Sequence, residues 1–139
     1  MSELVSIPAS INGVVITFAD TVNRMVHPRI VECLSHIVER HPLEGVTVRT
    51  LHISSASDSH EWPSRHAQAK AVDISRVNGK KMFDSLYDTD VYFATQRLQY
   101  RFEEFLGRRE SYGPFMRLKC GQDNLKIQGH GDHIHFSVD

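Results

Sequence analysis

The sequence has few cysteines, no long apolar run and almost no net charge, and each of these absences limits the class of protein. Its two cysteines, Cys33 and Cys120, lie far apart and form no Cys-x-x-Cys pattern. Such a pair favours two buried thiols over a disulfide. No run of about 18 apolar residues predicts a membrane-spanning helix. The formal net charge of -1 gives no reason to expect binding to nucleic acid or to an anionic membrane.

The N-terminal residues carry neither the basic region nor the apolar core of a secretory signal. We therefore expect a protein that is synthesised in the cytoplasm without a signal peptide. No internal repeat, low-complexity tract or linker divides the 139 residues. This length, with 40% hydrophobic and 24% charged residues, predicts one domain over residues 1–139 with a single core. The sequence leaves the oligomeric state open.

Hydrophobic periodicity and turn residues predict a mixture of helices and strands. We expect helices over 28–41 and 91–106 and strands over 46–53, 71–74, 115–118 and 134–138. Asp90 is expected to cap the second helix and Gly107 to end it. Arg108 and Arg109 would then lie at a solvated helix end. The segment 14–18 is compatible with a short strand or with the start of a helix, and the order of the elements predicts an α+β fold.

Nine histidines are many for this length, and two segments far apart in the chain carry residues that bind metal ions. His66 and Asp73 stand seven residues apart, with small residues between them that allow a tight turn. His133 and His135 stand two apart, so on a strand they point to the same side of the sheet. Either pattern alone is more often accidental than a metal site. Together they predict a three-ligand zinc site whose fourth position is open for water.

The first of these segments resembles a known signature. The chain reads Ser64-x-His66-x-x-Ala69-x-Ala71-x-Asp73, which is similar to the Ser-x-His-x-x-Gly-x-Ala-x-Asp signature of the D-Ala-D-Ala metallopeptidases. That group also contains lysostaphin-type peptidases, penicillin-insensitive murein endopeptidases and the hedgehog signalling domain. The resemblance covers about residues 45–139, and it implies a small antiparallel sheet with helices packed on one side.

The C-terminal segment resembles the second signature of the same group, which is a terminal His-x-His or an acidic residue three before the last histidine. This chain has both, in His133-x-His135 and Asp132-x-x-His135. The resemblance implies zinc bound by His66, Asp73 and His135. It implies Asp132 as general base, with His133 beside the metal to stabilise the oxyanion or orient the water. On a regular strand Asp132 and His135 would point to opposite faces, so His133 stays open as an alternative base.

The activity that the resemblance implies is that of a zinc metallopeptidase acting on peptidoglycan stem peptides or cross-links. Small single-domain phage endolysins that cut the L-Ala–D-Glu bond share this length and this Asp-x-x-His ending. D,D-peptidases belong to the same group. The expected partner is therefore peptidoglycan, with neither nucleic acid nor membrane. Such a protein would act on the cell wall after release from the cytoplasm, or as part of a virion.

The sequence departs from the pattern of this group in two places. Ala69 stands where the signature has glycine, so a positive φ at this position would strain the backbone. The stretch 53–57 lacks the arginine that many relatives carry there to hold a carbonyl or carboxylate of the substrate. Arg49 and Arg65 are the candidates to replace it, although neither stands at the expected place. A zinc-binding structural domain without catalysis, such as a phage tail component, is therefore an alternative.

A second enzyme class fits part of the sequence. His52-x-Ser54 and His135-x-Ser137 are two His-x-Ser units on expected strands. They resemble the two-histidine phosphoesterases, in which paired imidazoles act as base and acid at a cyclic phosphate without a metal. This hypothesis leaves the segment 64–73 unexplained, so we place it behind the zinc peptidase.

Overall fold

The computed structural model describes residues 3–38, 47–57, 65–82, 88–124 and 129–139. Its helices are α1 (Pro28–Ile37) and α2 (Thr89–Phe102). Its strands are β1 (Val5–Ser6), β2 (Ser10–Ile11), β3 (Val14–Phe18), β4 (Met25–Val26), β5 (Thr50–Ser55), β6 (Ala71–Val77), β7 (Lys80–Lys81), β8 (Arg108–Tyr112), β9 (Arg117–Lys119), β10 (Gln122–Asp123) and β11 (Ile134–Val138). The described chain thus combines two helices with a mostly antiparallel sheet, which is the predicted α+β class.

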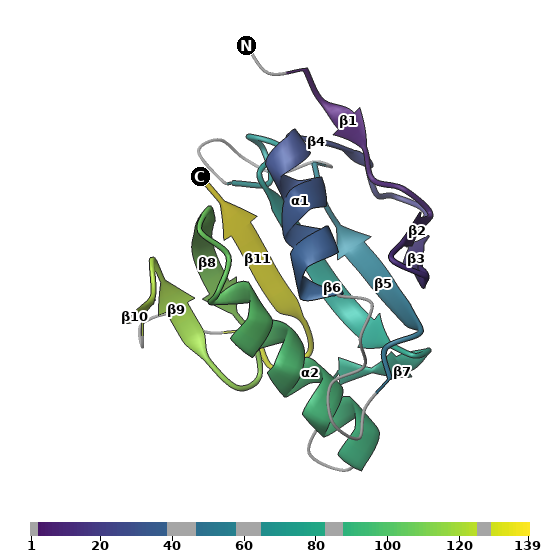
Figure 1. Cartoon of the computed structure of the whole chain (residues 1–139), viewed down its shortest axis with the longest axis vertical. Coiled ribbons are helices and arrows are strands. Elements are labelled where there is room, and N and C mark those ends of the chain that lie inside the picture. The colour runs from purple at the N-terminus through teal and green to yellow at the C-terminus, as the bar shows by residue number, and fades with distance from the viewer. Residues whose placement is uncertain (1–2, 39–46, 58–64, 83–87, 125–128) are drawn as a thin grey trace.

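Nine of these strands form one sheet, in the order β10-β9-β8-β11-β6-β5-β3-β2, with β7 paired to β6. Strands β1 and β4 pair separately. Within the described chain β3 and β5 are the one parallel pair, and the other pairs are antiparallel. The C-terminal strand β11 lies between β6 and β8 in the middle of the sheet (Figure 1). This topology places residues 71–77 beside residues 134–138, although they are far apart in the sequence.

Helix α1 begins where the sequence predicts. Pro28 occupies its first turn, and the His27 side chain caps it by accepting a hydrogen bond from the Arg29 backbone N–H at 3.1 Å. Its buried side chains recur at helical spacing and are Ile30, Cys33, Leu34 and Ile37. The helix ends at Ile37, and the predicted residues 39–41 lie outside the described ranges.

Helix α2 is shorter than predicted and has a different N-cap. Asp88, in an extended conformation, accepts hydrogen bonds from the backbone N–H groups of Asp90 and Val91 at 3.0 and 3.2 Å. Asp88 is therefore the cap, and Asp90 lies in the first turn instead. The helix ends at Phe102 and not at residue 106, because the next turn closes with hydrogen bonds three residues back instead of four.

The predicted strands are present, with shifted ends. Strand β11 has the predicted bounds, β6 runs on to residue 77, β5 covers 50–55 instead of 46–53, and β9 covers 117–119 instead of 115–118. Residue 46 lies outside the described ranges. The segment 14–18, for which strand and helix were both open, is strand β3. It pairs with β2 through a turn at Asn12 and Gly13, whose φ values of 51° and 82° suit a tight hairpin.

Strand β8 contradicts the prediction that Arg108 and Arg109 form a solvated helix end. It pairs with β11 on one side and β9 on the other, so this charged segment is an inner strand. Its charges have partners: Arg108 Nε lies 3.1 Å from Glu103 Oε2, and Glu110 Oε1 accepts a hydrogen bond from Ser137 at 2.7 Å. The hydrophobic pattern does not show this strand, because its charged side chains pair with other polar groups.

Alternation along β11 separates the core from the opposite face of the sheet. Ile134 and Phe136 are buried on the helix side, where the rings of Phe136 and Phe102 stack with their centroids 4.2 Å apart. His135 and Ser137 therefore point to the other face. Both helices lie on one side of the sheet (Figure 1), so these two side chains point away from them.

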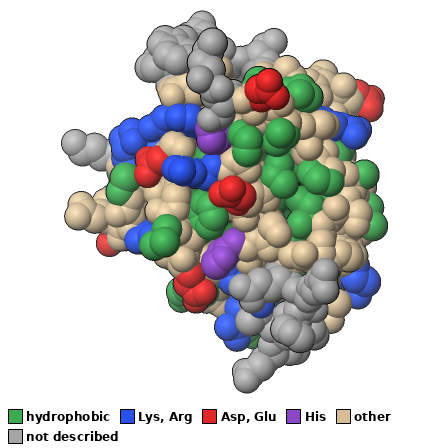
Figure 2. All heavy atoms as spheres, turned by 45° about the horizontal axis from the view of Figure 1, so that its top comes forward, with side chains coloured by type: hydrophobic (Ala, Val, Ile, Leu, Met, Phe, Trp, Pro, Cys, Tyr) green, Lys and Arg blue, Asp and Glu red, His purple; other side chains and the backbone are tan. Residues whose placement is uncertain are grey.

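The surface seen in Figure 2 mixes side chains of all kinds. Hydrophobic side chains gather on one half of that face, and Lys and Arg side chains with interspersed Asp and Glu lie mostly on the other half. The Lys and Arg side chains gather most closely at the upper left of this view, with Asp and Glu side chains beside them. In the part of the chain that the structure describes, no helix is long and apolar enough to cross a membrane.

Candidate metal centre

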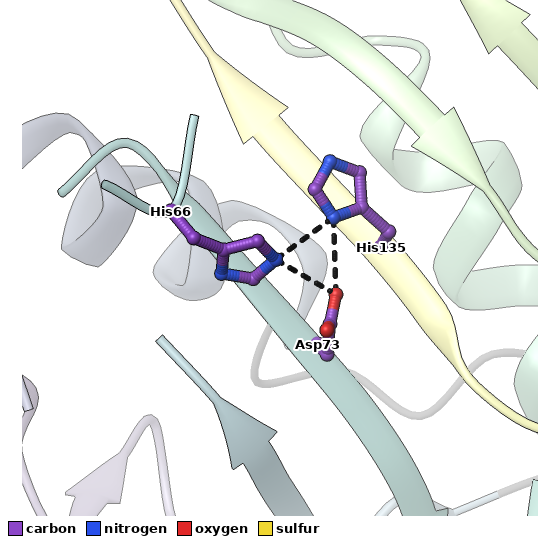
Figure 3. A group of neighbouring side chains, drawn as sticks. All are labelled: His66, Asp73 and His135. Atoms are coloured by element: carbon purple, nitrogen blue, oxygen red, sulfur yellow. Dashed lines mark hydrogen bonds and ion pairs between the residues drawn. The ribbon is translucent and has the colours of Figure 1, made fainter. Parts of the chain in front are cut away.

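Three residues from the two signature segments converge on the face of the sheet that points away from the helices. His66 lies in the turn 65–69, whereas Asp73 on β6 and His135 on β11 are direct partners in the antiparallel ladder. The sides of the triangle formed by His66 Nε2, Asp73 Oδ1 and His135 Nδ1 measure 3.2, 3.1 and 3.0 Å. Figure 3 shows the three side chains pointing toward one another. The fold thus brings together the three residues that the sequence predicts as metal ligands.

A tight turn carries His66 to this point. The turn closes through hydrogen bonds from Ala69 N to His66 O and from Lys70 N to Arg65 O, both at 2.9 Å. Ala69 has a φ of 59°, so it adopts the left-handed conformation at the position where the resembling signature has glycine. Ala69 therefore has the positive φ that its place in the signature suggested, and its backbone is strained there. Ser64, which opens the signature, lies outside the described ranges.

Hydrogen bonds on the far side of each imidazole determine which nitrogen faces the centre. His66 Nδ1 lies 2.7 Å from the backbone oxygen of Ala56, which can only accept, so the neutral ring carries its proton on Nδ1. His135 Nε2 lies 3.0 Å from Glu110 Oε1, and this carboxylate favours the proton on Nε2. Each neutral ring thus directs a lone pair toward the centre. Histidines that bind metals are held in this way, by donating their other N–H to a carbonyl or carboxylate.

The charges around this triangle favour a cation at its centre. Burial alone would raise the pKa of Asp73, but the hydrogen bond from His135 and the contact with the His66 imidazole outweigh burial and hold that pKa well below its usual range. Burial likewise lowers the pKa of His135, but the carboxylates of Asp73 and Glu110 outweigh burial and raise it to about 9. Without a metal the site therefore keeps a proton on His135, between two carboxylates. A metal ion would take the place of that proton.

The group His66, Asp73 and His135 can hold a metal ion. The three ligand atoms all lie within 4.8 Å of one another. The side chains are 6%, 18% and 12% exposed, so water screens them only in part. Imidazole nitrogen and carboxylate oxygen together are ligands that suit first-row transition metals.

The predicted catalytic residues lie just before β11. Asp132 and His133 belong to a bend, with Asp132 Oδ1 2.7 Å from His133 Nδ1. Because the regular strand begins only at Ile134, Asp132 is not forced to the face opposite His135. The His133 ring lies 4.9 Å from the His130 ring, which in turn lies 6.0 Å from the His135 ring. No hydrogen bond among the described residues joins Asp132 or His133 to the three metal-binding candidates, so their catalytic role stays a prediction.

Two residues of β8, Glu110 and Tyr112, surround His135 and were not predicted from the sequence. Burial raises the pKa of Glu110, but hydrogen bonds from His135 and Ser137 outweigh burial and lower it to about 2. The Tyr112 ring stacks on the His135 ring, with centroids 5.6 Å apart and an angle of 14° between the planes. The Glu-x-Tyr spacing would have placed both on one face of a strand. The two residues were not predicted to share a face, because no strand was expected over residues 108–112.

A cleft of about 600 Å3 opens beside His135. Its lining consists of Arg65, Gln68, Arg109, Glu110, Tyr112, Lys119, His130 and His135. Arg65, one of the two candidates for the missing arginine, therefore lies at the site. Arg49, the other candidate, is exposed and precedes β5, whose opposite end pairs with Asp73 through Ser55. The length of β5 thus separates Arg49 from the centre.

The two His-x-Ser units of the phosphoesterase hypothesis do not face each other. His52 lies on β5 and His135 on β11, and β6 runs between these strands. His52 Nδ1 instead lies 2.9 Å from the hydroxyl of Thr17 on β3, which is on the other side of β5. Strands two positions apart in a sheet are about 9.6 Å apart. The two imidazoles are therefore too far apart to act together on one phosphate.

Comparisons with protein-family models, with curated proteins and with solved structures found no match for this chain. Its fold and site define it as an α+β protein with a candidate metal centre of two histidines and one aspartate. A narrower function therefore has to rest on that centre and on the residues around it.

Proposed function

We propose that this protein is a zinc-dependent peptidase that hydrolyses peptidoglycan stem peptides or cross-links, with a fold of the D-Ala-D-Ala metallopeptidase and hedgehog type. The observation that carries the proposal is the convergence of His66, Asp73 and His135 at 3.0 to 3.2 Å from one another. In sequence, 62 residues separate Asp73 from His135. The two segments that resemble the signatures of this group therefore meet at one point in space.

Zinc is the metal that the ligand set supports best. Zinc bound tetrahedrally at about 2.0 to 2.1 Å holds its ligands roughly 3.3 Å apart. The three candidate ligand atoms lie 3.0 to 3.2 Å apart, so a small adjustment would admit the ion. Calcium and magnesium prefer six or more oxygen ligands, which two imidazoles do not supply. Three protein ligands are typical of catalytic zinc sites, which keep a fourth position for water.

The residues before β11 would supply proton transfer. Zinc, when bound, provides Lewis-acid activation of water and of the scissile carbonyl. Asp132 acts as general base, because its exposed carboxylate can take a proton from the attacking water and deliver it to the leaving amine. When its ring carries both protons, His133 donates from Nδ1 to this carboxylate, 2.7 Å away, and from Nε2 to the oxyanion. His133 is the alternative base.

The proposal includes both D,D-peptidases and peptidases of the L-Ala–D-Glu bond, acting as endopeptidases or carboxypeptidases. The protein would reach the cell wall after release from the cytoplasm, or as part of a virion. A zinc-binding structural or tail component is the alternative function. Both functions would use the same three ligands, so hydrolysis is the property that distinguishes them.

The test combines zinc stoichiometry with digestion of purified peptidoglycan, in which mass spectrometry identifies the newly exposed termini. We expect one zinc per chain and release of stem-peptide fragments. His66→Ala and Asp73→Ala should abolish both zinc binding and hydrolysis. Asp132→Ala should keep the zinc and lose hydrolysis. His52→Ala is the matched control, since it removes a histidine outside the centre and should change neither measurement.

Each other outcome has a definite meaning. One zinc per chain without any hydrolysis would support the structural alternative. Absence of stoichiometric zinc would refute the metal centre. If Asp132→Ala digests peptidoglycan normally and His133→Ala does not, the base is His133.

A further inference from the structure

The cleft beside His135 carries more positive than negative charge. Arg65, Arg109 and Lys119 line it, whereas Glu110 is its one carboxylate among the described residues. Glu110 is already engaged by His135 at 3.0 Å and by Ser137 at 2.7 Å. The excess of positive charge therefore faces whatever enters the cleft.

A bulge between β8 and β11 brings Arg109 into this cleft. Ser137 pairs with Glu110 and Val138 pairs with Arg108, so Arg109 is an extra residue that has no partner on β11. Regular alternation would place Arg109 and Glu110 on opposite faces of the sheet, but a bulge re-aims a side chain. Arg108 instead points toward the end of α2, where it contacts Glu103 at 3.1 Å. Arg109 and Glu110 consequently line the same cleft.

Two of the three cations of the cleft have no ion pair within the described chain, and the third has a long one. Arg109 forms an ion pair with the exposed Asp139, but its Nη1 lies 3.9 Å from Oδ1, which exceeds hydrogen-bond distance. Arg65 donates to the neutral side-chain oxygen of Gln68 at 2.9 Å, so it keeps its charge. Lys119 is exposed and has no ion pair among the described residues. These groups can therefore bind an anion at the cost of at most this one long and exposed ion pair.

We propose that Arg109, assisted by Arg65 and Lys119, binds a carboxylate of the substrate peptide and so determines which bond lies at the metal centre. The planar guanidinium of Arg109 matches a carboxylate in a bidentate arrangement. The inference rests on the proposed peptidase function. Residues of β8 and β9 would then bind the substrate carboxylate, because residues 53–57 contain no arginine that could bind it. The anion is either the terminal carboxylate or the α-carboxylate of the D-isoglutamyl residue, and the experiment separates these two sources.

The experiment measures peptide binding to the zinc-loaded protein by calorimetry, at low salt. The Asp132→Ala background is used throughout, because turnover should be blocked in it. The probe is the stem peptide L-Ala-D-isoglutamyl-L-Lys-D-Ala-D-Ala. Two singly amidated versions serve as comparisons, one amidated at the C-terminus and one carrying D-isoglutaminyl, and each keeps the other carboxylate. We expect one of these amides to bind about tenfold more weakly than the acid, since a hydrogen bond between charged groups is lost. The amide that loses affinity identifies the carboxylate.

Arg109→Gln should weaken binding of the unamidated peptide by about tenfold and remove the difference between this peptide and the amide that binds more weakly. Arg76→Gln, an exposed arginine on β6 outside the cleft, is the matched control and should leave that difference unchanged. Arg109→Lys keeps the charge but loses the guanidinium fork, so it should restore part of the discrimination. A general folding defect would weaken all three peptides equally.

Equal binding of acid and both amides by the protein with Arg109 intact would overturn the inference, and so would no detectable binding of any of them. Equal weakening of all three peptides by Arg109→Gln would overturn it as well. Failure of the peptidase proposal is seen separately, as absence of peptidoglycan digestion by the wild-type protein. A discrimination that depends on Arg109 would support the anion site even in that case.

Discussion

Replacing Glu110 by glutamine tests whether His135 is a metal ligand held by its neighbour. Glu110 Oε1 accepts hydrogen bonds from His135 Nε2 at 3.0 Å and from the Ser137 hydroxyl at 2.7 Å. Glutamine has nearly the same shape and keeps one acceptor oxygen, so β8 should stay in place. The substitution removes the negative charge that makes His135 more basic and fixes its tautomer. Metal affinity should therefore fall while the fold is retained.

The size of the loss depends on pH, because a proton competes with the metal at His135. Loss of such a supporting partner typically weakens metal binding by about 10- to 100-fold, or roughly 1.4 to 2.8 kcal/mol. The pKa of His135 is raised to about 9, so at pH 7 removing its proton costs on the order of 2 to 3 kcal/mol. Glu110 contributes to that raised pKa, so Glu110→Gln also reduces the cost of removing the proton. We therefore expect a smaller loss of zinc affinity at pH 7 than at pH 9.

The assay is competition between the protein and a chromophoric chelator for zinc, at both pH values. Glu104→Gln is the control, because it removes an exposed carboxylate just beyond α2 and should leave the affinity unchanged. Zinc affinity of Glu110→Gln within a factor of two of wild type at pH 9 would refute the assignment of His135 as a ligand supported by Glu110. A loss larger at pH 7 than at pH 9 would show that the proton competition has the wrong sign.

Three further outcomes are expected. Because the pKa of His135 is raised, its proton stabilises the metal-free fold fully below the usual pKa of 6.5, and this stabilisation is lost as pH rises through about 9. Zinc binding at pH 7 should therefore release about one proton. Calorimetry in buffers of different ionisation enthalpy counts the protons released. Phe136→Ala should lower the free energy of unfolding in urea by about 3 to 5 kcal/mol, since it removes a fully buried ring stacked on Phe102; a loss below about 1 kcal/mol would contradict the core described above. Cys120 should react with a thiol reagent in the native protein, whereas Cys33 should react only after unfolding, because burial raises the pKa of the Cys33 thiol. Equal reaction rates of the two thiols in the native protein would contradict this expectation.

The cysteines also show where composition misleads. Two buried thiols without a disulfide were expected, and both cysteines are indeed free. Cys33 is buried in α1, but Cys120 is exposed in the turn between β9 and β10, with a φ of 51°. Burial of a single residue depends on the turn in which it stands, and local composition does not specify that turn.

The sequence determined by itself those features that depend on neighbouring residues. The start of α1 follows from Pro28 and an apolar stripe, and the Asn12-Gly13 pair marks the hairpin between β2 and β3. Element ends were less predictable, as with α2, because several nearby carboxylates compete for one N-cap and only backbone geometry selects Asp88. The ligand types and their spacing could likewise be read from the sequence, and the resemblance to two known signatures singled out His66, Asp73 and His135.

Only the tertiary structure decided how those ligands are supported. Strand β8 carries Arg109, Glu110 and Tyr112. Its charged sequence has no hydrophobic pattern from which a strand could be predicted. These three residues reach the centre because β11 inserts between β6 and β8, and because a bulge turns Arg109 into the cleft. Strand order and register arise from contacts between segments distant in the chain, and the free energy of those contacts cannot be inferred from the residues of one segment alone.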